Sequence, residues 1–513
     1  MSLLDYKTYH EARENFRWNE VWELFEGTRE KFNIAHECID RHRGKGTAIR
    51  VKFDDGRIEE YSFDDISLQS SRFANALKTI GVKAGDRVAI MLDPSREFYV
   101  SFFGTLKRGA VAVPFYPLFG PEAVAYRVRD SRPGLVVTSE AKARLFDTFS
   151  APHIITTGSR FDSFIAKEPV EYQGGEETRG NDVALLQYTS GTTRRFPEGI
   201  RQFHKFLPVL IPSAVFGLGL RRGDRFFCPS SPAWGHGLWQ GTLVPLALGI
   251  SVGAYSGRFS EKMFLDAIQQ FEVNNLSAAP TAFRRLKNSG LLNHAHPRLE
   301  RISYSMEAMD TDTFNFLKSS FGVSPCSLYG STEVGVIILH YNGYPDYDIK
   351  AGSIGKAMLG LDVAVLDEQG NKLPPGRIGD IAVRRKCLWV RVKDAGVCDE
   401  DGYFWHKGRV DDVIKSGGWT ISPSEIEEVL QRHAAVEEAV VAGATDEERG
   451  QIVKAYLKVN TKPNQALKKE IQEFVKKKLS KHEYPRVIEF VEEIPKTPAG
   501  KIDRKKIKEW ASP

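Results

Sequence analysis

The feature of this sequence that most limits its fold is a regular alternation of short apolar segments with longer amphipathic ones. RVAIML (87–92) and AVAVPF (110–115) have the length and composition of buried strands, and the segment between them has the apolar spacing of a helix. A strand, a helix and a second strand in this order predict a parallel sheet with helices packed against it. Similar alternation recurs from about Asp182 to Val336, so we expect a large α/β region.

Two regions have a different pattern. Residues 47–63 alternate apolar and polar side chains on both sides of Asp55-Gly56, which predicts a β-hairpin. From about Gly352 to Asp401 the chain contains short strand-like segments separated by Gly and Pro turns. We expect short strands here, in a pattern different from that of the α/β region before them.

The C-terminal part predicts a small α+β unit. Ser422 is a good helix N-cap, Pro423 suits the first helical position, and Glu425 completes a capping box. Further elements are expected as strands near 437–444 and 453–460 and a helix within 467–479. The tail is rich in Lys and Arg, which indicates either a solvated helix face or a surface that meets phosphates.

Composition excludes several classes of protein. The 513 residues are 42% hydrophobic and 27% charged, which is typical of a globular chain. A net charge of +5 is mild for this length, so we expect anionic small molecules and no nucleic acid as partners. Five cysteines without CxxC spacing, no secretory signal and no long apolar segment predict reduced, mostly buried thiols in a cytoplasmic protein without integral membrane association.

The segment LLQYTSGTTRRFPEG (185–199) begins as a strand and continues as a loop of hydroxyl residues and glycine. Backbone N–H groups in such a loop can approach phosphate oxygens closely. The loop is not a Walker A motif, which requires GxxxxGK[ST]. The predicted phosphate-contacting residues are Thr189, Ser190, Gly191, Thr192 and Thr193.

Three further stretches follow this loop in the chain: SLYGSTEVG (327–335), GRVDDVIKSGGW (408–419) and PKTPAGKIDR (495–504). In order and spacing, the four stretches resemble the motifs of the adenylate-forming superfamily. The tail HEYPRVIEFVEEIPKTPAGKIDR (482–504) resembles its medium-chain acyl-CoA synthetase branch. The resemblance implies an N-terminal domain (1–410) of parallel-rich sheets with packed helices and a distorted β-barrel. It also implies a small mobile α+β lid (411–513).

The implied reaction has two steps. A carboxylate attacks the α-phosphate of ATP to give an acyl-adenylate and pyrophosphate, and coenzyme A then displaces AMP. By resemblance, Lys501 bridges the carboxylate and the phosphate, Glu333 holds Mg²⁺ and Thr332 contacts phosphate. Tyr329 and Glu307 match positions of the adenine pocket, where Met306 replaces the family's usual glycine.

The resemblance also assigns residues around the predicted domain boundary. Asp394 matches the aspartate that holds the ribose hydroxyls, although Val392 and Lys393 replace the family's Thr and Gly. Carboxylate oxygens can accept two hydrogen bonds at once, as this role requires. Further implied roles are ribose or phosphate contact for Arg409, the hinge for Asp411, and the pantetheine tunnel for Gly417 and Gly418.

The phosphate loop departs from the family's usual TSGTTGxPKG. Arg194 replaces a glycine, one residue is inserted, and Glu198 stands where the family has lysine. Two unit charges about 4 Å apart interact by about 4 kcal/mol at an effective dielectric near 20. A carboxylate directed at the terminal phosphates would therefore prevent ATP binding. We expect Arg194 or Arg195 to supply the missing charge and Glu198 to turn away.

The substrate is indicated by SPAWGHGLWQGTLVPLALG (231–249), which resembles the acyl-pocket segment of the family. His236 matches a position near the carboxylate, and Trp234 and Trp239 are either pocket walls or core. Gly330 stands where acetate-specific relatives have tryptophan, which predicts an open pocket and a medium-chain, branched or aromatic acid.

Several alternatives remain at this stage. The same chemistry could act on acetate or propionate, or the acyl group could pass to a carrier protein. A catalytically silent nucleotide- or acyl-binding protein is the alternative outside the enzymes. The oligomeric state is expected to be a monomer or a homodimer.

Overall fold

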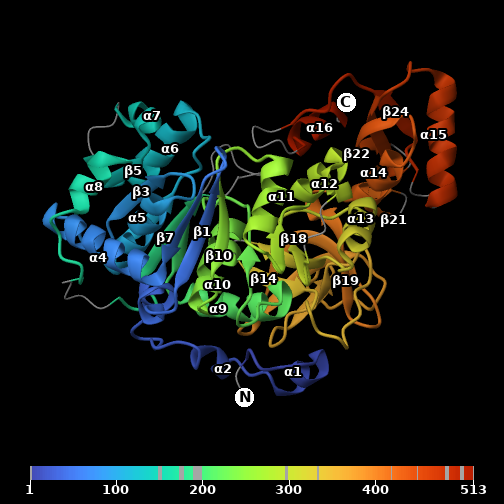
Figure 1. The fold of residues 1–513 in the computed structure, drawn as a ribbon. Coiled ribbons are helices and arrows are strands. Elements are labelled where there is room, and N and C mark those ends of the chain that lie inside the picture. The colour runs from blue at the N-terminus through green and yellow to red at the C-terminus, as the bar shows by residue number, and fades with distance from the viewer. Residues whose placement is uncertain are drawn as a thin grey trace. The chain divides into compact units, whose positions relative to one another are not determined.

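The computed structural model describes residues 3–147, 153–172, 178–188, 199–294, 298–331, 334–416, 419–446, 449–479, 484–496 and 502–511 (Figure 1). The chain divides into two compact units. The first comprises Met1–Ala351 and Met358–Gly360, and the second comprises Gly352–Ala357 and Leu361–Pro513. Each unit has its own apolar core.

The first unit contains a six-stranded sheet in the order β6-β5-β3-β4-β7-β8. Its strands are β3 (Arg87–Met91), β4 (Val111–Pro114), β5 (Leu135–Thr138), β6 (His153–Thr156), β7 (Val183–Tyr188) and β8 (Gly199–Phe203). Helix α5 (Arg96–Lys107) connects β3 to β4 and packs against both strands, which are parallel. The predicted strand–helix–strand unit is therefore confirmed.

A second sheet of the first unit has the order β14-β13-β12-β11-β9-β10-β1-β2. Its strands are β1 (Thr47–Phe53), β2 (Ile58–Ser62), β9 (Phe226–Phe227), β10 (Val252–Ser256), β11 (Asn275–Ala278), β12 (Arg301–Tyr304), β13 (Cys326–Ser331) and β14 (Gly335–Leu339). Neighbouring strands from β13 to β1 are parallel, and β1 with β2 forms the predicted hairpin.

Helices cover these sheets because each helix has one apolar side that is buried against a sheet. In α12, for example, Phe283 and Leu286 are buried in one core cluster with Leu276 of β11 and Ile302 of β12. Besides α5, the longer helices of this unit are α4 (Phe63–Thr79), α6 (Pro121–Ser131), α9 (Phe206–Ser213), α11 (Glu261–Gln270), α12 (Pro280–Ser289) and α13 (Thr311–Phe321). The shorter ones are α1 (Tyr9–Asn15), α2 (Asn19–Trp22), α3 (Ile34–Cys38), α7 (Glu140–Ala143), α8 (Ser159–Ile165) and α10 (Val244–Ala247).

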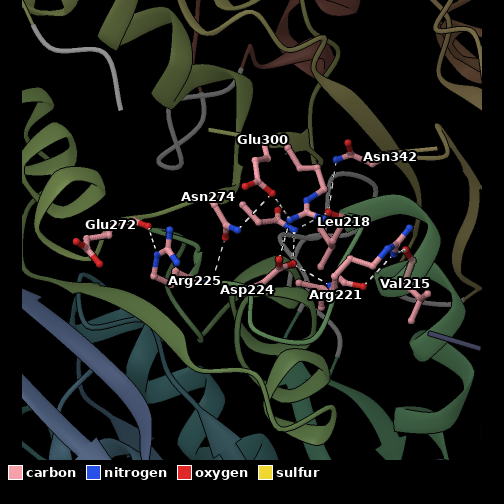
Figure 2. A network of polar contacts seen from close by, with 12 residues as sticks. Val215, Leu218, Arg221, Asp224, Arg225, Glu272, Asn274, Glu300 and Asn342 are labelled. Atoms are coloured by element: carbon pink, nitrogen blue, oxygen red, sulfur yellow. Dashed lines mark hydrogen bonds and ion pairs between the residues drawn. The ribbon is translucent and has the colours of Figure 1, made fainter. Parts of the chain in front are cut away.

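A buried polar network joins the amino ends of β9, β11 and β12 (Figure 2). Asp224 accepts hydrogen bonds from Arg301 Nη2 at 2.7 Å, Asn275 Nδ2 at 3.1 Å and the Arg221 backbone N–H at 2.9 Å. Burial raises the pKa of Asp224, and the nearby Arg301 charge opposes that shift. The network therefore lies at the amino ends of these strands, whereas the candidate site lies at the carboxyl ends.

The second unit begins with an antiparallel sheet in the order β16-β17-β18-β19-β15. Its strands are β15 (Gly355–Ala357), β16 (Val363–Leu366), β17 (Gly379–Arg385), β18 (Leu388–Cys398) and β19 (Tyr403–Arg409). The short strands predicted between 352 and 401 are therefore confirmed. The predicted domain boundary near Asp411 lies inside this compact unit and stays a prediction.

The remainder of the second unit is the predicted α+β structure. Its elements are β20 (Ile414–Ser416), β21 (Trp419–Ile421), α14 (Pro423–Gln431), β22 (Val436–Asp446), β23 (Gly450–Val459), α15 (Gln465–Lys478), β24 (Val487–Phe490) and α16 (Arg504–Ala511). β22 and β23 form a long antiparallel pair, and β24 adds to β23 in parallel. Together with the first unit, these elements confirm the predicted α/β class.

Helix α14 begins where the sequence predicts, but the predicted capping box is wrong. Ser422 is the N-cap and Pro423 occupies the first turn, yet the Ser422 side chain makes no capping hydrogen bond. Its hydroxyl instead donates to the Lys407 carbonyl at 2.8 Å, and Glu425 forms an ion pair with the Lys407 ammonium. A charged partner from β19 therefore takes Glu425 away from the helix terminus.

All five cysteines are free, and Cys38, Cys228 and Cys326 are buried as expected. Cys387 is exposed, and Cys398 is half-buried. Within the described residues, we find no helix that combines the length and apolar character needed to cross a membrane.

Candidate functional site

The candidate residues of the first unit gather where parallel strands end. His236 follows β9, Glu307 follows β12, and Tyr329 lies in the second half of β13. The predicted phosphate loop follows Tyr188, the last residue of β7, in the sequence. The carboxyl ends of parallel strands meet at one edge of a sheet, which is where ligands bind in open α/β sheets. Residues that are far apart in sequence are therefore brought to the same side of their sheets.

His236 begins a π-helical segment, His236–Leu243, and is buried. Its Nδ1 lies 3.0 Å from Ser230 Oγ, and its Nε2 lies 2.9 Å from Ser277 Oγ. Burial lowers the pKa of His236 to about 4, so the ring is neutral at neutral pH. Both ring nitrogens already have partners, so a contact with the acid's carboxylate requires one serine to rotate away. The geometry favours a role in joining β9 to β11.

The two tryptophans of the predicted acyl-pocket segment have different environments. Trp239 is buried, donates from Nε1 to Gln202 Oε1 at 2.8 Å and packs on Phe206, so it belongs to the core. Trp234 is half-buried, and its ring centroid lies 5.4 Å from that of Tyr116 and 6.2 Å from that of Phe119. Trp234 is therefore the better candidate for a pocket wall.

The sequence interpretation missed Arg127, a buried cation in α6. Its guanidinium lies 3.9 Å from the ring centroid of Phe119 and 5.3 Å from that of Tyr188. Its Nη1 donates to the Ala123 carbonyl at 2.8 Å. Burial lowers the pKa of Arg127, and among the described residues the faces of Phe119 and Tyr188 lie against its charge. One arginine at a helical position gives no sequence signal for this arrangement.

Glu307 is held by polar groups of α12. Its carboxylate accepts from Thr281 Oγ1 at 2.7 Å and from Arg284 Nη2 at 2.6 Å. The preceding residue, Met306, has φ of 79°, which is the left-handed region that favours glycine. The left-handed backbone at residue 306 thus explains why the family pattern has glycine at this position.

Gly330 does not face open space in the direction that a side chain would take. An ideal Cβ on Gly330 would lie 1.9 Å from the carbonyl oxygen of Gly335, in the neighbouring strand β14. Any side chain here would require β14 to move. The direction of a Gly330 side chain therefore gives no support for a larger acid, and the open pocket stays a prediction.

In the second unit, Asp394 and Arg409 occupy facing positions on β18 and β19. Arg409 Nη1 lies 2.9 Å from Asp394 Oδ1, and His406 Nε2 lies 3.8 Å from Asp394 Oδ2. The two residues that the motifs assign to the ribose are thus brought together by one antiparallel pair. Lys393, beside Asp394, has φ of 63°, where the family pattern has glycine.

Comparison with known families decides the class of the chain. The family model for AMP-binding enzymes matches residues 39–389, and the model for the C-terminal domain of AMP-binding enzymes matches residues 425–501. The chain belongs to the AMP-binding enzyme family. Within this family it is an AMP-forming ligase of the acyl-CoA synthetase type, as its relatives are.

Curated relatives of this AMP-binding enzyme cover nearly its whole length. It is 32% identical to acetyl-coenzyme A synthetase of Bacillus subtilis (strain 168), over 98% of this chain and 95% of that protein. It is 31% identical to the mitochondrial acyl-coenzyme A synthetase ACSM3 of Mus musculus, over 94% and 91%. The structure is similar to that of the anthranilate CoA ligase AuaEII in complex with anthranoyl-AMP, with a TM-score of 0.83, 28% identity, and 97% and 99% coverage.

Several predicted site residues of this AMP-binding enzyme lie outside the described residues. They are Thr189, Ser190, Gly191, Thr192, Thr193, Arg194, Arg195, Thr332, Glu333, Gly417, Gly418 and Lys501. The side chain of Asp411 is likewise not described. Among the described residues there is no cluster of three His, Cys, Asp or Glu side chains suited to a metal ion. The roles of these residues, including Mg²⁺ binding by Glu333, stay predictions.

Proposed function

We propose that this AMP-forming acyl-CoA synthetase activates a medium-chain, branched or aromatic carboxylic acid. The observation that carries this choice is the aromatic group of Tyr116, Phe119 and Trp234, because Trp234 lies in the predicted acyl-pocket segment. Aromatic side chains bury large apolar areas, and each buried CH₂ of an acyl chain contributes about 0.8 kcal/mol.

Acetate or propionate is the second candidate. It is favoured by the 32% identity to an acetyl-coenzyme A synthetase and by the absence of space beside Gly330. A panel of acids separates the two candidates: acetate, propionate, butyrate, octanoate, isobutyrate and benzoate. We expect the highest kcat/KM for pyrophosphate release with one of the four larger acids. A maximum at acetate or propionate would contradict the proposal.

In the proposed adenylation step, each residue has the role that the family motifs assign to it. Tyr329 and Glu307 flank the adenine, while Asp394 and Arg409 hold the ribose. Thr332 and the loop residues 189–193 bind phosphate through hydroxyl and backbone N–H groups. Glu333 would hold Mg²⁺, and the ion would supply positive charge at the pyrophosphate. Lys501 stabilises the charge that develops as the carboxylate attacks the α-phosphate.

The thioester-forming step uses different residues. Asp411 is the proposed hinge at which the C-terminal part rotates between the two half-reactions. Gly417 and Gly418 leave room for the pantetheine arm of coenzyme A. Assays with free coenzyme A and with a holo-carrier protein test whether the acyl group goes to coenzyme A directly. Faster transfer to the carrier would identify the alternative acceptor.

The altered phosphate loop is the main reason to consider a silent protein. We expect Arg194 or Arg195 to replace the missing lysine charge, so Arg194→Ala or Arg195→Ala should raise the KM for ATP. If neither substitution changes the ATP dependence, this compensation is wrong. If no acid led to pyrophosphate release, a catalytically silent nucleotide- or acyl-binding protein would be favoured.

The cytoplasmic location and the monomeric or homodimeric state are further proposals from the sequence.

A further inference from the structure

A buried bidentate ion pair joins two helices of the second unit. Glu427 of α14 is almost completely buried, and Arg504 is the first residue of α16. Arg504 Nη1 lies 2.7 Å from Glu427 Oε1, and Arg504 Nη2 lies 2.7 Å from Glu427 Oε2. The rigid fork of a guanidinium fits a carboxylate in this geometry, so the pair fixes direction as well as distance.

The same pair also binds the backbone of β22. The Val441 N–H donates to Glu427 Oε1 at 2.7 Å, and Arg504 Nη1 donates to the Val441 carbonyl at 3.2 Å. Among the described strands, β22 lies at the end of its sheet, so these backbone groups face away from its partner β23. The pair therefore fixes α14, α16 and an edge strand to one another at a single point.

Arg504 lies three positions after Lys501, and the chain on both sides of residues 497–501 is anchored. Lys496 and Ile502 form an antiparallel bridge, and the Asp503 N–H donates to the Pro495 carbonyl at 2.8 Å. Ile502 packs against an apolar cluster that includes Val440, Tyr456 and Ile507. The bridge, this cluster and the ion pair together fix the chain at residues 495–496 and 502–504, on either side of residues 497–501.

Stability alone does not account for this pair. Replacing a buried ion pair by apolar residues of similar volume is often neutral or stabilising, whereas a hydrogen-bonded pair selects one arrangement. We propose that Glu427 and Arg504 are positioning residues for adenylation, because they fix the anchor from which Lys501 is presented. The proposal rests on the proposed function, in which Lys501 acts at the α-phosphate.

The test uses the full-length enzyme with Glu427 and Arg504 both replaced by Met. The double replacement leaves no buried charge unpaired, but it also removes the partners of the Val441 backbone N–H and carbonyl, so we expect a lower thermal unfolding midpoint in an enzyme that still folds. Acid-dependent pyrophosphate release should fall by about ten- to hundred-fold in kcat, since small misplacements of a reacting group have effects of this size. Thioester formation from coenzyme A and the synthetic adenylate of the best acid in the panel should be nearly unchanged.

Two further variants make the result specific. Arg504→Lys keeps the charge but loses the fork, so its adenylation rate should lie between those of the unmodified enzyme and the double variant. Glu437→Gln breaks the half-exposed Lys458–Glu437 ion pair of the same unit and should leave both half-reactions unchanged.

The following results would overturn the inference. Unchanged adenylation in the folded double variant would show that the pair does not position Lys501. An equal loss of both half-reactions would indicate a general structural role. If Lys501→Ala lost adenylation while the double variant kept it, the inference would be wrong and the proposed function would stand. Retained adenylation in Lys501→Ala would instead refute the proposed role of Lys501, and the inference with it.

Discussion

Asp394 and Arg409 face each other across β18 and β19, with Arg409 Nη1 2.9 Å from Asp394 Oδ1. The arginine orients the carboxylate through one oxygen, and His406 lies 3.8 Å from the other. The two residues are 15 positions apart in the sequence. The antiparallel pairing of β18 with β19 places them opposite one another.

Replacing Asp394 by Asn should weaken ATP binding. A hydrogen bond to a charged group contributes about 1.5–3 kcal/mol, so we expect the KM for ATP to rise about ten- to hundred-fold. The measurement is pyrophosphate release against ATP concentration at saturating acid. Asp380→Asn is the matched control, because Asp380 pairs with Arg391 between β17 and β18 of the same sheet. An equal change in both variants would mean that Asp394 acts only through the sheet.

Buried histidines should make the enzyme sensitive to acid. Burial lowers the pKa of His236, and that of His204, to about 4, well below the ordinary value of 6.5. Between pH 6.5 and 4 the unfolded chain holds more protons than the folded one, so the free energy of unfolding falls as the pH falls. One such histidine contributes a slope of up to about 1.4 kcal/mol per pH unit.

Urea unfolding at several pH values between 4.5 and 7.5 measures this slope. His236→Gln should flatten it, because glutamine takes no proton in this range. The exposed His153 provides the control, and His153→Gln should leave the slope unchanged. The account of His236 would be refuted by equal slopes in the unmodified enzyme and in His236→Gln.

The sequence predicted the elements of the fold better than their side-chain contacts. The strands near 87–92 and 110–115 were predictable because apolar spacing depends on local sequence alone. The partners of Glu425 and His236 could not be predicted. Lys407 and Ser277 lie on strands elsewhere in the chain, and only the fold brings them close to Glu425 and His236. Arg127 was missed for the same reason, since its aromatic partners lie on other segments.

The motifs located the candidate site along the chain but did not give its conformation. The replacement of glycine by Met306 was visible in the sequence, whereas its left-handed backbone was not. Likewise, Gly330 could be compared with a tryptophan in relatives, but the carbonyl of Gly335 that blocks its Cβ belongs to the next strand. Backbone conformation and strand neighbours therefore decide what such replacements mean.

Met306→Gly should stabilise the first unit. A non-glycine residue in the left-handed region costs about 1–3 kcal/mol, and glycine loses about 0.5–1 kcal/mol more backbone entropy on folding. Met306 is 48% exposed, so few packing contacts are lost. We expect a net gain of about 1 kcal/mol in the free energy of unfolding, measured with urea. Met306→Ala keeps a Cβ in the same backbone conformation and should show no gain; a similar gain in both variants would argue against strain at this residue.

Gly330→Ala should destabilise the enzyme although it adds only one methyl group. The new Cβ would start 1.9 Å from the Gly335 carbonyl oxygen and 2.8 Å from the Val336 Cα, and both are backbone atoms that cannot rotate away. Forcing strands apart in this way costs about 1–3 kcal/mol. Gly134→Ala is a suitable control, because among the described residues, its chain neighbours apart, none has an atom within 4 Å of the Cβ that it would add. If Gly330→Ala were as stable as Gly134→Ala, space would exist beside β13, and Gly330 would again support a larger acid.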